Sequence, residues 1–108
     1  MAEVRIDEVM RYLEQRVAES GLAEARIILF GSHARGTATE ESDVDVAIIS
    51  PSFRGKGLFE RAQLTKDAEI SAIRRFMIPF DIVTLTPEEY DGGSMIGEFI
   101  KSAAGSSI

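Results

Sequence analysis

The chain of 108 residues contains no cysteine and no tryptophan, and it has a single histidine. Without cysteine, disulfide bonds and thiolate metal sites are excluded. No apolar run approaches the roughly 18 residues that a membrane-spanning helix needs. The charged start MAEVRIDEVM also lacks the apolar centre of a signal peptide. We therefore expect a cytoplasmic protein that has no membrane partner.

Positive charge is also scarce, because 12 Lys and Arg stand against 18 Asp and Glu, for a net charge of -6. Proteins that hold long nucleic acids neutralise several phosphates with Lys and Arg, so we do not expect such a partner. An acidic protein that binds an anionic ligand needs cations to mediate the contact. The length and the 44% hydrophobic content fit one domain over residues 1–108 with a modest core.

Hydrophobic periodicity and turn residues predict four helices and three strands. In chain order these are a helix from Ile6 to about Ser20-Gly21, strands over 25–30 and 44–49, a helix over about 58–76, a strand over 80–85, a helix starting at Thr86-Pro87, and a short helix around 95–100. In the helix over 58–76, the residues near one face are Ala62, Thr65, Ala68, Ala72, Ile73 and Phe76. The segment between the first two strands is too short for a parallel crossover with a full helix. This order predicts the α+β class, with helices packed on a mixed β-sheet.

A glycine-serine turn, Gly31-Ser32-His33-Ala34-Arg35-Gly36, follows the first predicted strand. Glycine permits a tight turn, and Ser32 would begin a short helix whose free N–H groups can hold phosphate oxygens. Arg35 either reaches a phosphate or packs on the surface. His33 is expected to be an exposed polar residue without a role. Taken alone, this turn is more simply an ordinary Gly-Ser turn that caps a helix.

Three aspartates are the second chemical feature. Asp43 and Asp45 are one residue apart at the start of a strand, so their side chains point to the same face. Asp81 interrupts an apolar strand, so we expect it to be buried and to need a basic partner or a metal. If the two strands are neighbours, three carboxylates converge, which suits two Mg²⁺ ions about 4 Å apart. An isolated Asp-x-Asp would more simply be a pair of solvated acids.

The spacing of these two features resembles a known family. Gly31-Ser32, ten residues, and Asp43-x-Asp45 form the signature of the DNA polymerase β-like nucleotidyltransferase superfamily, and GSHARGTATEESDVDVAII is similar to its minimal members over about 27–85. The resemblance implies the nucleotidyltransferase fold, with ATP as substrate and its β- and γ-phosphates held at Gly31 and Ser32; Arg35 is a further candidate for binding the nucleotide. It also implies that Asp43, Asp45 and Asp81 bind two Mg²⁺ ions and that Asp81 acts as general base.

The resemblance also bears on the acceptor. Many minimal members are paired with a HEPN-domain protein, a helical RNase-type toxin, and act as antitoxin by adding AMP to a tyrosine of the toxin. Two alternatives stay open: a non-catalytic antitoxin that binds its partner, and transfer to a small molecule such as an aminoglycoside. The nucleotide base, the oligomeric state and the role of the tail over 103–108 also stay open. The candidates for a partner surface, each of which could equally be core, are Met77, Ile78, Met95, Ile96, Phe99 and Ile100.

Overall fold

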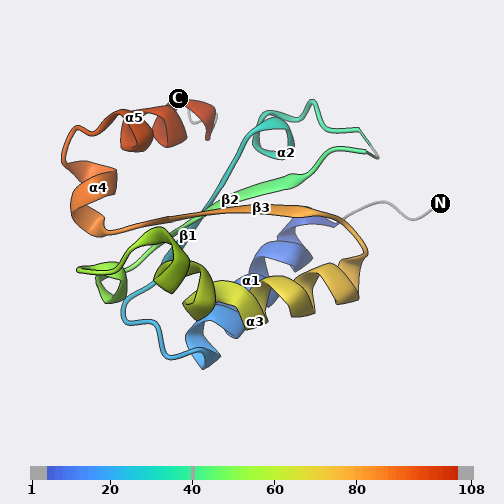
Figure 1. Cartoon of the computed structure of the whole chain (residues 1–108). Helices are drawn as coiled ribbons and strands as arrows, with labels where there is room; N and C mark the ends of the chain where they lie inside the picture. The colour runs from blue at the N-terminus through green and yellow to red at the C-terminus, as the bar shows by residue number, and fades with distance from the viewer. Residues whose placement is uncertain (1–4, 40, 105–108) are drawn as a thin grey trace.

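The computed structural model describes residues 5–39 and 41–104, which form a three-stranded sheet with helices on both faces (Figure 1). Its elements are α1 (Ile6–Glu19), β1 (Arg26–Phe30), α2 (Ser32–Arg35), β2 (Val44–Ile49), η1 (Pro51–Phe53), α3 (Leu58–Phe76), β3 (Phe80–Leu85), α4 (Pro87–Asp91) and α5 (Met95–Ala103). The predicted α+β class and element order are confirmed. Of the tail, residues 105–108 lie outside the described part. No helix in the described ranges has both the length and the hydropathy to span a membrane.

The sheet is mixed, in the order β1-β2-β3. Strand β1 pairs antiparallel with β2, and β2 pairs parallel with β3. Helix α3 makes the crossover that a parallel pair requires. The register places Asp45 opposite Phe30 on one side and opposite Asp81 on the other. The C-terminal end of β1 and the N-terminal ends of β2 and β3, which carry the sequence motif, therefore lie at the same end of the sheet.

One face of the sheet forms the main core against α1 and α3, which lie side by side (Figure 1). The side chains of Val44, Val46 and Ile48 on β2 are fully buried on this face. They alternate with residues of the opposite face, as the pleat of a strand requires. Helix α1 contributes Val9, Leu13 and Val17, which are spaced four residues apart and are also buried. This spacing is the signal that predicted the helix.

The buried stripe of α3 differs from the predicted one. Ala62 and Ile73 are exposed, and the buried residues of the helix are Arg61, Thr65, Ala68 and Ala72. Arg61 is buried because its charge is fully paired. Its guanidinium donates to both carboxylate oxygens of Glu89, at 2.7 and 3.2 Å, and to two backbone carbonyls. An apolar pattern does not reveal a buried charge of this kind.

The other face of the sheet is covered by α4 and α5. Their buried core consists of Phe30, Ala47, Ile49, Leu85, Tyr90, Ile100 and Ala103. Among the candidates for a partner surface, Ile78 and Ile100 belong to the core, whereas Met77, Met95, Ile96 and Phe99 are exposed. This cover does not enclose the edge where the aspartates lie.

Candidate functional site

The aspartates of β2 and β3 lie beside each other. Asp45 and Asp81 are register partners on neighbouring parallel strands, so both side chains project from the face that α5 partly covers. Asp45 is half-buried and Asp81 is exposed. The prediction that Asp81 is buried was therefore wrong, because the helices leave the start of β3 uncovered on this face. The apolar neighbours of Asp81 that suggested burial face α1 and α3 instead.

Gly31 lies so close to Asp45 that any side chain at this position would force the Asp45 carboxylate to move. Its backbone has φ 81°, in the region that side chains rarely adopt. A Cβ atom at this position would lie 2.2 Å from Oδ2 of Asp45. The N–H of Gly31 also donates to the carbonyl of Ala103 at 3.0 Å, which ties the turn to the end of α5. The glycine therefore allows the turn to close on the carboxylate.

The single helical turn α2 follows Gly31. The N–H groups of Ala34 and Arg35 donate to the Gly31 carbonyl. Within the described ranges, the N–H groups of Ser32 and His33 donate no hydrogen bond. As far as the described residues go, these two donors and the Ser32 hydroxyl are therefore available to an anion.

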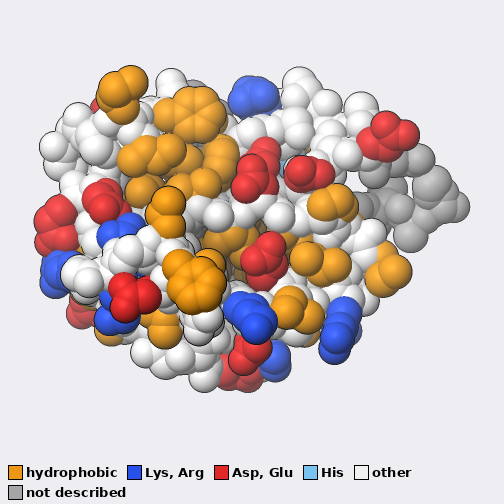
Figure 2. Space-filling model, viewed as in Figure 1, with side chains coloured by type: hydrophobic (Ala, Val, Ile, Leu, Met, Phe, Trp, Pro, Cys, Tyr) orange, Lys and Arg blue, Asp and Glu red, His pale blue; other side chains and the backbone are white. Residues whose placement is uncertain are grey.

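The Gly31-Ser32 turn, Asp45 and Asp81 line one cleft of about 550 Å³. This volume lies in the size range of small-molecule sites. Its lining residues are Phe30, Gly31, Ser32, Arg35, Asp45, Asp81, Val83, Ile96, Phe99, Ile100 and Ala103. The turn and the aspartates form a polar end, and α5 forms an apolar wall. Figure 2 shows hydrophobic side chains gathered next to acidic ones on this face of the molecule.

The acids of the site repel one another. Burial, followed by the charges of Asp81 and Asp43, raises the pKa of Asp45, and electrostatic interactions with His33 and Arg35 oppose that rise. Burial and the charge of Asp81 likewise raise the pKa of Glu69 on α3. The sequence analysis did not single out Glu69, since only the packing of α3 against β3 brings it near Asp81.

Asp43 lies just before β2 and is exposed. Within the described ranges, no three His, Cys, Asp or Glu side chains are placed so that they could hold a metal together. The structure thus pairs Asp45 with Asp81 but does not gather all three aspartates into one ligand cluster. The donor set still fits Mg²⁺, because carboxylate oxygens are its preferred ligands and a cation would offset both the burial and the acidic neighbours that raise the pKa of Asp45.

His33 is less exposed than the sequence predicted. The residue is half-buried, and its Nε2 atom is buried without a hydrogen-bond partner among the described residues. The reason is that α2 packs against both β1 and β2, which covers part of its side chains. The pattern of one turn in a sequence gives no sign of this packing.

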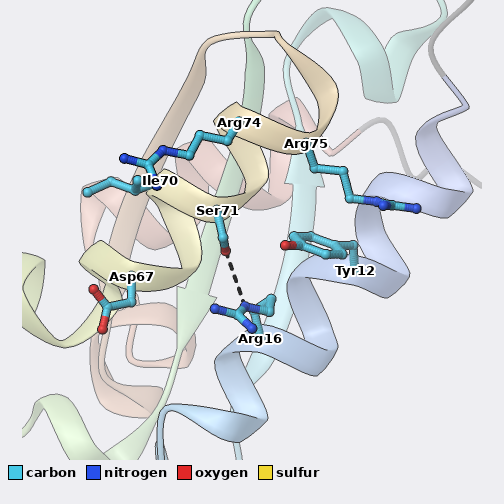
Figure 3. Close-up of a pocket in the computed structure, with 7 residues that line it drawn as sticks. All are labelled: Tyr12, Arg16, Asp67, Ile70, Ser71, Arg74 and Arg75. Carbon is cyan, nitrogen blue, oxygen red and sulfur yellow. Dashed lines mark hydrogen bonds between the residues drawn. The ribbon is translucent and has the colours of Figure 1, made fainter.

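A second cleft, of about 580 Å³, lies between α1 and α3 (Figure 3). It contains three arginines, but their guanidinium groups do not converge. Arg74 and Arg75 point in opposite directions, and Arg16 donates from Nε to the Ser71 hydroxyl (Figure 3). Arg75 instead lies over the ring of Tyr12, 5.4 Å from its centroid. The cleft beside Asp45 and Asp81 is therefore the candidate functional site.

Comparison with known proteins identifies the family of the chain. Residues 7–103 match the nucleotidyltransferase domain family, and this stretch contains the turn and all three aspartates. The chain belongs to this family. The resemblance seen in the sequence is thereby confirmed, and the chain is grouped with nucleotidyltransferase enzymes.

The similar proteins differ in how much they share with this chain. A proposed protein adenylyltransferase of Methanocaldococcus jannaschii is 32% identical over 84 residues, which are 78% of this chain and 54% of that protein. The chain thus spans about half the length of this relative. A proposed nucleotidyltransferase of Sulfolobus solfataricus has a similar structure, with a TM-score of 0.55, 24% identity, and coverage of 85% of this chain and 84% of that one.

The fold also resembles that of the BolA domain of SufE1 from Arabidopsis thaliana. The TM-score is 0.50 at 25% identity, and the match covers 82% of this chain and 99% of that domain. A fold alone therefore does not select a function here. The functional argument rests on the residues of the site and on the family.

Proposed function

We propose that this chain transfers AMP from ATP to a hydroxyl group of a partner protein. The observation that carries the proposal is the pairing of Asp45 with Asp81, directly beside the Gly31-Ser32 turn. The turn offers donors for phosphate oxygens, and the carboxylates lie where an acceptor can approach. Transfer of a phosphoryl-type group depends mainly on such positioning and on neutralisation of charge.

In this proposal, different residues of the polar end bind the phosphates and accept the proton. The Ser32 hydroxyl and the free N–H groups of Ser32 and His33 hold oxygens of the β- and γ-phosphates. Arg35, which lines the same cleft, adds a positive charge. The acceptor oxygen forms a bond to the α-phosphorus, the bond to the β-phosphate oxygen breaks, and pyrophosphate leaves. The proton of the acceptor hydroxyl passes to the carboxylate of Asp81, which is exposed and thus accessible to a large acceptor.

The metal requirement is also part of the proposal. Asp43, Asp45 and Asp81 would hold two Mg²⁺ ions. Bound there, Mg²⁺ would neutralise the phosphate charge and stabilise the attacking and leaving oxygens. The repulsion at Asp45 supports this assignment, because a carboxylate with a raised pKa and two acidic neighbours gains from a nearby cation.

For the acceptor, we propose a tyrosine of a HEPN-type partner, so that the chain acts as an antitoxin. Two observations support a protein acceptor. The relative from Methanocaldococcus jannaschii is named for protein adenylyltransferase activity, and Asp81 lies exposed at the surface rather than in a closed pocket. The HEPN partner itself rests on the resemblance to minimal nucleotidyltransferases.

The test combines the chain with a HEPN-type partner, Mg²⁺ and ATP labelled at the α-phosphate. We expect label on a tyrosine of the partner, and a loss of at least about a hundredfold in rate for Asp81→Asn. Asp67→Asn is the matched control, because Asp67 is an exposed aspartate of the other cleft. An Asp81→Asn variant that still neutralises the partner would contradict the proposal and favour the non-catalytic binding module.

A further inference from the structure

The apolar wall of the cleft has no role in the transfer chemistry. It is formed mainly by Ile96 and Phe99 of α5, which remain 40% and 57% exposed although both are large hydrophobic residues. Their neighbour Met95 is even more exposed but does not line the cleft. The wall is thus a distinct part of the α5 surface that faces the cleft.

The position of the wall relative to the turn is fixed. The ring of Phe99 meets that of Phe30 edge to face, with centroids 6.1 Å apart and planes at 78°. Phe30 directly precedes Gly31, and the Gly31 N–H is bonded to the Ala103 carbonyl at the end of α5. Phe99 and the C-terminal end of α5 are therefore held next to the Gly31-Ser32 turn that would bind the phosphates.

We propose that Ile96 and Phe99 form the binding site, here called the seat, for the nucleobase of the bound triphosphate. The inference rests on the proposed function. One continuous cleft has a polar end for an anion and an apolar end for a flat ring, and a nucleoside triphosphate has both parts in one molecule. Its volume of about 550 Å³ fits a small molecule of this kind.

The side chains of the wall also determine which nucleobases it can distinguish. The polar side chains that line the cleft are Ser32, Arg35, Asp45 and Asp81, and all belong to the other end. Among the residues that the structure describes, no lining side chain at the apolar end can form hydrogen bonds with the edge of a base. Stacking on an aromatic ring tolerates any base and favours those that stack strongly. The seat therefore selects purines over pyrimidines and separates ATP from GTP only weakly.

Calorimetry with the intact chain and Mg²⁺ tests this seat, with ATP, GTP, UTP and inorganic tripolyphosphate as probes. We expect ATP and GTP to bind with similar affinity, and both to bind about tenfold more tightly than tripolyphosphate. Phe99→Ala should weaken ATP binding about tenfold and leave tripolyphosphate binding unchanged. Phe99→Tyr should retain the wild-type affinity, and Met95→Ala is the control on the same helix. Circular dichroism establishes that each variant is folded.

The outcomes separate this inference from the proposed function. A wild-type chain that binds tripolyphosphate as tightly as ATP would overturn the seat alone. Unchanged ATP affinity in a folded Phe99→Ala variant whose transfer to a protein acceptor is impaired would assign the wall to the acceptor and also overturn it. A wild-type chain that binds neither ATP nor tripolyphosphate would overturn the proposed function and the seat together.

Discussion

The two faces of the sheet are covered to different extents. Under α1 and α3, every inward residue of β2 is apolar and fully buried, as Val44, Val46 and Ile48 show. On the opposite face, Ala47 and Ile49 are just as buried, but Asp45 remains half-buried at the open edge. One strand therefore serves as core on one face and as both core and candidate site on the other. The difference arises because α4 and α5 cover only part of the sheet.

The largest expected effect comes from two neighbouring isoleucines on opposite faces. Ile48→Ala and Ile49→Ala each remove a fully buried side chain, so each should lower the free energy of unfolding by about 2–5 kcal/mol. Ile49 packs under α5 and Ile48 does not. Only Ile49→Ala should also weaken ATP binding, measured by calorimetry after urea unfolding has given the stabilities. Equal ATP affinity in both variants would show that packing on the two faces contributes equally to ATP binding.

The next effect concerns the glycine against Asp45. Gly31→Ala should destabilise the chain by about 1–3 kcal/mol through backbone strain alone, and the clash with Asp45 adds to this cost. Triphosphate binding should be lost with it. Gly36→Ala is the matched control, because Gly36 also has a positive φ, of 77°, but nothing lies within 4 Å of its missing Cβ. If both variants bound ATP equally, the close approach to Asp45 would have no functional meaning.

A smaller effect is expected at the ion pair that joins the helices of the two faces. The hydrogen bond from Arg61 lowers the pKa of Glu89, against the opposing effect of burial. Ionised Glu89 therefore stabilises the fold above the ordinary pKa of a glutamate, and this stabilisation disappears as the pH falls through the lowered value. Glu89→Gln should cost about 1 kcal/mol at pH 7, since the carboxylate is partly exposed and screened. Unfolding curves should show this cost shrinking in acid, whereas a cost independent of pH would rule out the charge as its source.

The smallest expected effect is a gain in stability at the open edge. Because burial and its acidic neighbours raise the pKa of Asp45, the ionised side chain destabilises the folded chain at neutral pH. Asp45→Asn should therefore raise the melting temperature slightly in the absence of Mg²⁺. With Mg²⁺ and ATP added, we expect the wild type to gain stability and the variant to gain little. A variant that melts lower than the wild type without Mg²⁺ would show that the carboxylate has a structural role.

Much of the fold, and the turn of the candidate site, can be predicted from local sequence patterns. The helices, the strands and the turn at Gly31 depend on periodicity and turn residues, which short segments carry. Three features depend on distant packing instead. The exposure of Asp81 depends on how far α5 extends, the burial of Arg61 depends on Glu89 of α4, and the buried Nε2 of His33 depends on how α2 lies on the strands. Local patterns do not contain this information.

The register of β2 and β3 also links correct folding to activity. Because side chains alternate along a strand, a slip of β3 by one residue would turn Asp81 toward α1 and α3 and place Phe80 or Ile82 at the site. Such a chain would bury a charge among apolar residues and would also lack the pair of acids. Under the proposed function, misregistered molecules would thus be unstable and inactive at the same time. Selection that acts on catalysis alone would therefore also maintain the accuracy with which the strands align.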